Sequence, residues 1–306
     1  MESFNNSVSY CLTPVMRQRY YQTNDRNYNS FFFNGGEPHV HLSQNNELVK
    51  TSVEHVYIAS RLRNAAEFLQ LLVMVDACSR YYPNAEIVAY LPYIPGARQD
   101  RVYTGEALTV KVYVDMLNNS QIDRIITKDP HSDVQTALLE TKLQVINGLD
   151  LADRVYDRIS TDHGQDPLVI FPDTGAKKKY VNQLRVNTAI SNGSLTRAKS
   201  NKPWYITGDK LRNTLTGKIT GFKILDEYTF HSDEPVLLID DICDGGGTFI
   251  GLGKELRKRG VVHLYLFVTH GIFSKGFSDL NTVFTRIYTT DSWQAKYDEE
   301  YEPRIL

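Results

Sequence analysis

Cysteine is scarce in this sequence, and long hydrophobic runs are missing from it. Three of the 306 residues are cysteines, and their unrelated spacings predict neither a disulfide framework nor a zinc site. No apolar run is long enough to cross a bilayer, and the N-terminus lacks the basic region and apolar core of a signal peptide. We therefore expect a cytoplasmic protein with reduced cysteines and no membrane partner.

An excess of charge of one sign is missing as well. The 34 lysines and arginines nearly balance the 36 aspartates and glutamates, which gives a net charge of −2. This balance does not imply a surface that binds polyanions, so no nucleic-acid partner is expected. The length fits one large or two medium α/β domains, each able to bury a core.

The chain is organised around residues 236–251, which read VLLIDDICDGGGTFIG. The stretch starts as a short apolar run typical of a buried parallel strand, and Asp240 and Asp241 lie at the end of that run. A glycine triplet and Thr248 follow. The residues after them have helical spacing up to a stop at Gly260.

A strand, an acid pair, a glycine-rich turn and a helix in this order favour a site for a phosphorylated sugar. The glycines let the backbone approach an anion closely, and the amides at the helix N-terminus supply a positive field for phosphate. The two carboxylates suit vicinal sugar hydroxyls or a hydrated magnesium ion. The alternative is a structural turn whose acids only cap the helix, and the combination of features makes that interpretation the weaker one.

Strands alternate with helices in both halves of the chain, which predicts parallel sheets. The predicted strands are 8–12, 28–33, 38–42, 54–59, 86–91, 124–126, 143–146, 168–171, 204–207, 218–225, 236–239 and 262–268, and the clearest helices are 65–82, 108–117, 149–159 and 249–260. Asn147 and Gly148 mark the predicted domain boundary. Residues 208–213 are a predicted polar loop, and the stretch 191–203 is a predicted excursion rich in Ser, Asn and Lys.

Eight segments, in order over residues 33–275, resemble the ribose-phosphate diphosphokinases, also called phosphoribosyl pyrophosphate synthetases. They are FNGGE (33–37), LLVMVDA (71–77), ARQDR (97–101), DPH (129–131), FPDTGAKK (171–178), DKLR (209–212), LIDDICDGGGT (238–248) and VTHGIF (268–273). The resemblance implies an α/β fold of two similar phosphoribosyltransferase-type I domains, each with a largely parallel sheet flanked by helices. Residues 1–147 would form the ATP-side domain, and residues 148–306 the sugar-phosphate-binding domain.

The resemblance also implies an activity, the magnesium-dependent transfer of the β,γ-diphosphate of ATP to the C1 hydroxyl of ribose 5-phosphate. AMP would be released, and the protein would be a homo-oligomer, either a dimer or a hexamer. ATP would be bound by Phe33, Gly35, Gly36, Glu37, Arg98 and Gln99. The sugar phosphate would be bound by Asp240, Asp241, Asp244, Gly245, Gly246, Gly247 and Thr248. Magnesium would be held by His131 and Asp173, and the catalytic cations would be Lys210 and Arg212.

The residue types suit this chemistry, because diphosphoryl transfer requires positioning and the neutralisation of negative charge. Lys210 and Arg212, two residues apart in a polar loop, suit a flexible cationic lid. Taken alone, they would be two solvated charges on a hairpin. Lys177, Lys178 and Lys179 are the least specific signal, and a solvated helix end is the alternative interpretation for them.

Four departures from the family pattern bear on the substrate. Gly35 stands where the family has an acid, residues 102–105 (VYTG) replace a basic stretch, and the excursion at 191–203 lengthens the approach to the lid. The phosphate loop reads DGGGT where the family has DTAGT, so Gly245 and Gly246 remove a hydroxyl and a methyl group. A more open loop predicts an acceptor whose 5-phosphate carries a further group, such as ADP-ribose. Its pyrophosphate would suit NAD salvage rather than nucleotide biosynthesis.

Two other functions fit parts of the sequence. A phosphoribosyltransferase would share the sugar-phosphate loop, but the ARQDR segment and the first α/β half argue against it. A catalytically silent regulatory relative would fit Gly35 and the excursion at 191–203, whereas Lys210 and Arg212 argue against that function.

Overall fold

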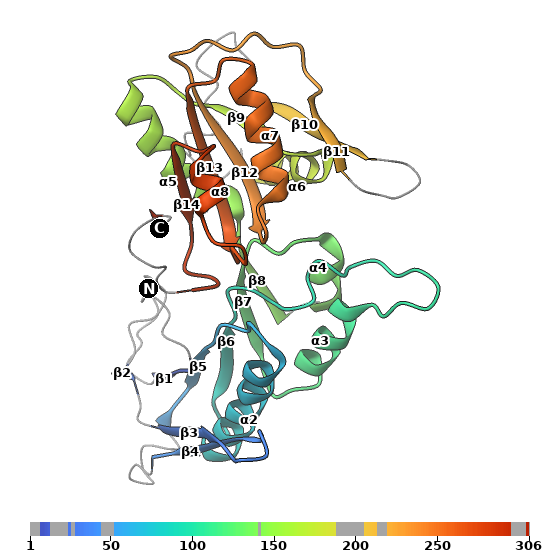
Figure 1. Ribbon diagram of the computed structural model, residues 1–306. Helices are drawn as coiled ribbons and strands as arrows, with labels where there is room; N and C mark the ends of the chain where they lie inside the picture. The colour runs from blue at the N-terminus through green and yellow to red at the C-terminus, as the bar shows by residue number, and fades with distance from the viewer. Residues whose placement is uncertain are drawn as a thin grey trace. The chain divides into compact units, whose positions relative to one another are not determined.

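The computed structural model describes residues 7–12, 24–25, 28–43, 52–139, 142–187, 205–212, 219–294 and 304–305 (Figure 1). The predicted excursion at 191–203 lies outside these residues, and so does most of the N-terminal stretch 1–27. The chain divides into two compact units, Met1–Ile146 (unit 1) and Asn147–Leu306 (unit 2).

Unit 1 is built on a parallel sheet of six strands in the order β2-β1-β5-β6-β7-β8. Its strands are β1 (Ser7–Cys11), β2 (Asn24–Asp25), β5 (His55–Ala59), β6 (Glu86–Tyr90), β7 (Arg124–Lys128) and β8 (Leu143–Ile146). Consecutive residues of the central strands are buried, such as Val88 and Ala89 of β6. Both faces of this sheet are therefore covered, which is usual for parallel sheets.

Three helices share a core with this sheet, namely α2 (Ala65–Tyr81), α3 (Thr109–Asn118) and α4 (Asp133–Leu139). Apolar residues of α2 at three- and four-residue steps, such as Phe68, Leu71 and Val75, pack with strand residues such as Ile58. A hairpin of β3 (Tyr28–Phe32) and β4 (Pro38–Leu42) packs on α2. The predicted strand–turn–strand pattern around residues 34–37 is thereby confirmed.

Unit 2 holds a seven-stranded sheet in the order β11-β10-β9-β12-β13-β14-β15. Its strands are β9 (Leu168–Phe171), β10 (Tyr205–Arg212), β11 (Ile219–Ile224), β12 (Pro235–Cys243), β13 (His263–Gly271), β14 (Arg286–Thr289) and β15 (Arg304–Ile305). All neighbours pair in parallel except β10 and β11, which form an antiparallel pair.

Helices cover both faces of the sheet in unit 2 (Figure 1). They are α5 (Gly148–His163), α6 (Thr174–Asn187), α7 (Gly247–Lys258) and α8 (Ser278–Asn281). On one face, Leu252 and Leu256 of α7 pack with Leu238 of β12. On the other face, Tyr180 of α6 stacks on Phe171 of β9, with ring centroids 5.6 Å apart. The predicted α/β layering is confirmed in this unit.

The strand order of unit 2 changes direction at β9. The chain runs from β9 to β10 on one side and then returns to β12 on the other side. In an open α/β sheet, such a switch point leaves a crevice at the carboxyl ends of the two diverging strands, where ligands bind. Unit 1 follows the same pattern, with β2 and β5 on either side of β1. The two units share a topology, as the prediction of two similar domains requires.

Two strands of unit 2 extend beyond their predicted ends. The predicted polar loop at 208–213 continues as β10, so the backbones of Lys210 and Arg212 pair with β11. Strand β13 runs on to Gly271, whereas its predicted end was Val268. The ladder hydrogen bonds come from the backbone, so polar side chains at a sheet edge or at a carboxyl end do not stop a strand.

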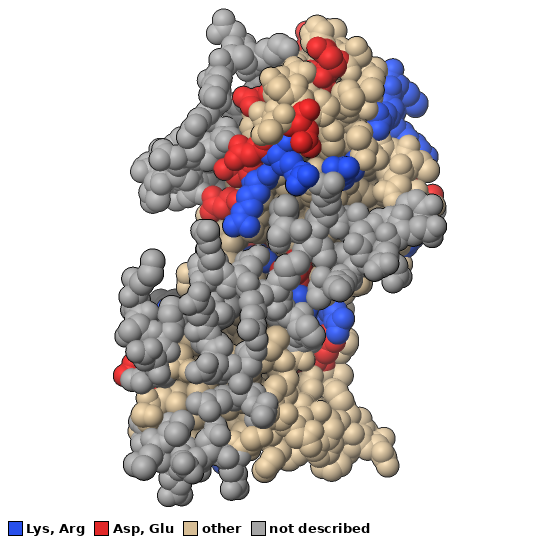
Figure 2. Space-filling view, turned by 90° about the vertical axis from the view of Figure 1, so that its left-hand side faces the viewer, with Lys and Arg blue, Asp and Glu red and all other residues tan. Residues whose placement is uncertain are grey.

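The surface of unit 2 on the side of α5 mixes charges of both signs. The exposed residues of α5 include Asp150, Arg154, Asp157 and Arg158. Figure 2 views the molecule from this side and shows acidic and basic side chains next to one another on unit 2. Within the described ranges, no helix is both long enough and apolar enough to cross a membrane.

Candidate functional site

Three carboxyl groups meet at the switch point of unit 2. Asp173 follows the end of β9, and Asp240 and Asp241 lie in the last residues of β12. Because β9 and β12 pair in parallel, their carboxyl ends lie at the same edge of the sheet. The negative charges of Asp241 and Asp173 both act on Asp240. The structure thus brings together three residues that were predicted from separate segments.

A lysine from α6 joins these acids. The Nζ atom of Lys179 lies 2.8 Å from Oδ2 of Asp241. The two side chains are 17% and 6% exposed, so this ion pair is screened less by water than a surface pair. The backbone N–H of Asp241 donates to Oδ1 of Asp240 at 2.9 Å. Both carboxyl groups are therefore held in fixed orientations by groups of the protein.

The pKa of Asp240 lies well above its ordinary value. Burial is the largest cause, and the neighbouring charges of Asp241 and Asp173 raise the pKa further, while the N–H of Asp241 and the charge of Lys179 lower it. The Asp240–Asp241 pair places carboxyl oxygens side by side at the end of β12, which suits the vicinal hydroxyls of a sugar.

The turn at 244–246 places a glycine at the start of α7. Gly246 is the N-cap residue, and its φ of 73° lies in the left-handed region that glycine adopts without strain. As a glycine it has no side chain with which to cap the helix. The first amides and the positive end of the dipole make this end of α7 suited to an anion.

Two glycines let the β10–β11 hairpin lie close to α7. A Cβ atom built on Gly251 of α7 would lie 2.0 Å from the ring of Phe222, so no larger residue fits there. A Cβ atom on Gly208 of β10 would lie 3.2 Å from Leu252 of α7. Phe222 is also the ladder partner of Lys210. The backbone of the predicted catalytic lysine is therefore held beside the helix that begins at the glycine turn.

Asp173 and the lysines after it belong to the first turns of α6. Oδ1 of Asp173 accepts the backbone N–H of Ala176 at 3.0 Å and so caps the helix. Residues 177–179 are all lysines, although the helix dipole disfavours cations in this position. Lys178 is exposed, as predicted for a solvated helix end. That interpretation is wrong for Lys179, which pairs with Asp241 instead.

The role of Lys179 was not predicted, although the sequence carries a signal for it. A cation near a helix N-terminus is unfavourable unless negative charge lies close by, and here Asp241 supplies that charge. A run of lysines near the N-terminus of a helix therefore indicates that an acidic side chain from elsewhere in the chain lies close to it.

The residues predicted to bind ATP lie in two segments of unit 1. The first segment is the turn of the β3–β4 hairpin, which holds Phe33, Gly35, Gly36 and Glu37. Gly36 has a φ of 88°, and the N–H of Phe33 donates to the carbonyl of Glu37 at 2.9 Å. The second segment is the loop between β6 and α3, where Arg98 and Gln99 are exposed. Side chains at both segments face solvent, as a nucleotide site requires.

The two residues predicted to hold magnesium lie in different units. His131 follows β7 in unit 1, and Asp173 follows β9 in unit 2. Within the described ranges, no group of three or more His, Cys, Asp or Glu side chains is arranged to hold a metal ion. Magnesium does not require such a cage, because it keeps several waters and binds through one or two carboxylates together with substrate phosphates. Asp173 supplies one carboxylate of the kind that such a magnesium site uses.

Comparisons with known proteins agree on one family. The family profile described as the N-terminal domain of ribose phosphate pyrophosphokinase matches residues 20–120. The ribose-phosphate pyrophosphokinase of Pasteurella multocida is 27% identical over 248 residues, which are 79% of this chain and 70% of that protein. The ribose-phosphate pyrophosphokinase of Vibrio cholerae is 25% identical over 264 residues, which are 85% of this chain and 76% of that protein.

A solved structure shares the fold. The phosphoribosylpyrophosphate synthetase from Mycobacterium smegmatis aligns with a TM-score of 0.70 and 20% sequence identity. The alignment covers 94% of this chain and 89% of that one. Both α/β units of this chain are therefore included in the likeness.

Proposed function

Because this chain is a divergent member of the ribose-phosphate pyrophosphokinase family, we propose that it transfers the β,γ-diphosphate of ATP to the C1 hydroxyl of a ribose 5-phosphate unit. A bond forms between the C1 oxygen and the β-phosphorus of ATP, and the bond from that phosphorus to the α,β-bridging oxygen breaks. AMP leaves, and the hydroxyl proton passes to solvent. The observation that carries this proposal is the pair Asp240 and Asp241 at the end of β12, directly before the glycine turn that begins α7.

The acceptor side of the proposal uses residues of unit 2. Asp240 and Asp241 bind the 2- and 3-hydroxyls of the ribose, because their carboxyl groups lie side by side and accept hydrogen bonds from hydroxyl groups. The 5-phosphate binds the glycine turn and the first amides of α7. The remaining loop residues of this set are Asp244, Gly245, Gly246, Gly247 and Thr248.

The donor side of the proposal uses residues of unit 1 and two cations of β10. ATP binds Phe33, Gly35, Gly36, Glu37, Arg98 and Gln99. Lys210 and Arg212 neutralise the charge that develops on the transferring phosphates. His131 and Asp173 hold magnesium, which supplies further neutralisation of the triphosphate when bound. A homo-oligomer, either a dimer or a hexamer, is also part of the proposal.

The acceptor itself is proposed to be ADP-ribose or ribose 5-phosphate. The departure from DTAGT supports ADP-ribose, because Gly245 and Gly246 remove a hydroxyl and a methyl group from the loop. The 5-phosphate in such a loop has room to continue into a second phosphate. The product would then be ADP-ribose carrying a diphosphate at C1, and the activity would belong to NAD salvage.

The proposal is tested by incubating the protein with ATP, magnesium and each acceptor in the absence of a nucleobase. We expect AMP and an acceptor whose mass has increased by a diphosphate, both measured by mass spectrometry. AMP release without a nucleobase would exclude a phosphoribosyltransferase. No AMP with either acceptor would contradict the proposed activity, and product from ribose 5-phosphate alone would end the ADP-ribose proposal.

A further inference from the structure

A lysine from outside the phosphate loop lies over its first glycine. Lys275 belongs to the turn that follows β13, and its side chain is exposed. A Cβ atom built on Gly245 would lie 3.4 Å from Cε and 3.5 Å from Cδ of Lys275. The aliphatic stem of Lys275 therefore lies over Gly245, at van der Waals distance from the place that a Cβ atom at position 245 would take.

The backbone below Lys275 is fixed to the phosphate loop. The N–H groups of Ile272 and Phe273 both donate to the carbonyl of Cys243, at 2.9 and 3.1 Å. The turn closes through the N–H of Gly276, which donates to the carbonyl of Phe273 at 2.8 Å. The ring of Phe273 is buried against Gly271, where a Cβ atom would lie 2.1 Å from it. Lys275 is thus carried by a rigid turn, and little ordering is required when it binds a ligand.

Across the described residues, the ammonium group of Lys275 takes part in no hydrogen bond and no ion pair. The stem of Lys275 lies over Gly245, the glycine that opens the turn. The amides of that turn and of α7 can satisfy one phosphate group. A cation at the rim of the same turn adds a partner for negative charge beyond that phosphate.

We propose that Lys275 is a specificity residue that binds the second phosphate of an acceptor whose ribose 5-phosphate continues into a diphosphate. This inference rests on the proposed function, because it takes the 5-phosphate to lie in the turn at 244–248. The second phosphate is bonded through one oxygen to the first, so it lies within reach of a cation that crosses Gly245. A monophosphate acceptor has no group at that position and gains less from Lys275.

The test compares two acceptors in variants of one residue. Lys275→Met removes the charge and keeps a stem of similar length, and Lys275→Arg keeps the charge. Lys258→Met is the matched control, because it removes an exposed lysine from the far end of α7. In Lys275→Met we expect the KM for ADP-ribose to rise about ten-fold and the KM for ribose 5-phosphate to change less than about two-fold. In Lys275→Arg we expect most of the affinity for ADP-ribose to return.

Calorimetric titration of each acceptor without ATP measures the same preference independently of turnover. We expect Lys275→Met to weaken ADP-ribose binding selectively and Lys258→Met to leave both acceptors unchanged. Equal changes for the two acceptors, a rise in the KM for ATP alone, or no change at all would overturn the role of Lys275. Absence of AMP release from the wild-type protein would instead contradict the proposed function. The titration would still decide whether Lys275 binds a second phosphate.

Discussion

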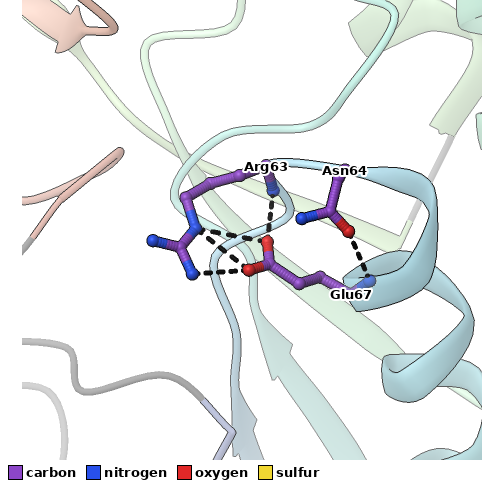
Figure 3. A network of polar contacts seen from close by, with 3 residues as sticks. All are labelled: Arg63, Asn64 and Glu67. Atoms are coloured by element: carbon purple, nitrogen blue, oxygen red, sulfur yellow. Dashed lines mark hydrogen bonds and ion pairs between the residues drawn. The ribbon is translucent and has the colours of Figure 1, made fainter. Parts of the chain in front are cut away.

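The helix that follows β5 in unit 1 and the helix that follows β12 in unit 2 occupy equivalent places in two similar topologies, yet their N-termini differ. In unit 1, Oδ1 of Asn64 accepts the N–H of Glu67 at 2.9 Å, and the Glu67 carboxylate accepts the N–H of Arg63 at 2.8 Å (Figure 3). The Arg63 guanidinium also pairs with Glu67. Side chains of the protein therefore accept the amide of Glu67 in the first turn of α2 and the amide of Arg63 just before the helix.

In unit 2 the equivalent position is a glycine. Gly246 takes the N-cap place of α7 and has no side chain with which to cap the helix. The proposed function assigns the first amides of α7 to the 5-phosphate of the acceptor. The same topology can thus carry a helix N-terminus that protein side chains cap or one that binds an anion. The residues of one short turn decide between the two.

The two hairpins differ in a related way. The β3–β4 hairpin of unit 1 carries aromatic residues, and the rings of Phe31 and Phe33 meet edge to face with centroids 5.0 Å apart. The β10–β11 hairpin of unit 2 carries Lys210 and Arg212. Aromatic surfaces suit a base, and cations suit transferring phosphates. The two hairpins are therefore expected to affect different kinetic constants.

The largest effect is expected from Lys210→Ala. If Lys210 neutralises charge in the transition state, kcat should fall by about 10² to 10³-fold, with little change in either KM. The measurement is AMP release under saturating ATP and acceptor. Lys223→Ala is the matched control, because Lys223 is an exposed lysine of the same hairpin, on β11. Turnover of Lys210→Ala equal to that of the control would remove the catalytic role of Lys210.

Gly247→Asp tests the proposed binding of phosphate at the N-terminus of α7. The new carboxylate would lie in the first turn of α7, where the helix dipole stabilises it by about 0.3–1 kcal/mol. The same charge repels a phosphate, so the acceptor KM should rise about 100-fold while thermal stability is kept. Gly247→Asn is the neutral control and should raise the KM far less. Unchanged acceptor affinity in Gly247→Asp would mean that the phosphate binds elsewhere.

Lys179→Met tests the charge balance among the acids. The change leaves the buried carboxylate of Asp241 without its cation, which should destabilise unit 2 by about 1–3 kcal/mol near neutral pH. Lys179 lowers the pKa of the neighbouring Asp240, so its removal raises that pKa further above the unfolded value. The loss of unfolding free energy is therefore largest above that folded pKa, and it becomes smaller as the pH falls through it. Urea unfolding at neutral and mildly acidic pH measures this, with Lys178→Met as the exposed control.

A deficit in Lys179→Met that stays constant with pH would contradict this account. It would mean that the lost stability comes from packing of the lysine stem rather than from an uncompensated charge. The acceptor KM of the same variant should also rise, because Asp241 loses the partner that orients its Oδ2.

Local patterns were enough to predict the order of strand, acid pair, glycine turn and helix in unit 2. The apolar run of β12 and the helical spacing of α7 are set by residues close in sequence. The end of β10 was not predictable in this way. Residues 208–212 are polar or small and resemble a loop, but their backbone pairs with β11, which comes later in the chain. Edge pairing of this kind depends on tertiary context more than on side-chain type.

The side-chain partners of the site were the least predictable part. Lys179 and Asp241 are 62 residues apart, and they meet only because β9 and β12 pair in parallel. Lys275 reaches Gly245 only because the turn after β13 is tied to the carbonyl of Cys243. Neither contact leaves a periodic signal in the sequence, because each depends on the position of a whole strand.

The smallest effect is expected from Asn64→Ala in unit 1. The variant loses the cap of α2, which should lower the free energy of unfolding by about 1 kcal/mol. Acceptor KM should not change, because this N-terminus is occupied by Glu67 and Arg63 rather than by substrate. Asn64→Asp is the control, since an aspartate can make the same capping bond and should restore stability. Weaker acceptor binding in Asn64→Ala at unchanged stability would show that the capped turn of unit 1 also meets the substrate, and the contrast between the two helix N-termini would no longer hold.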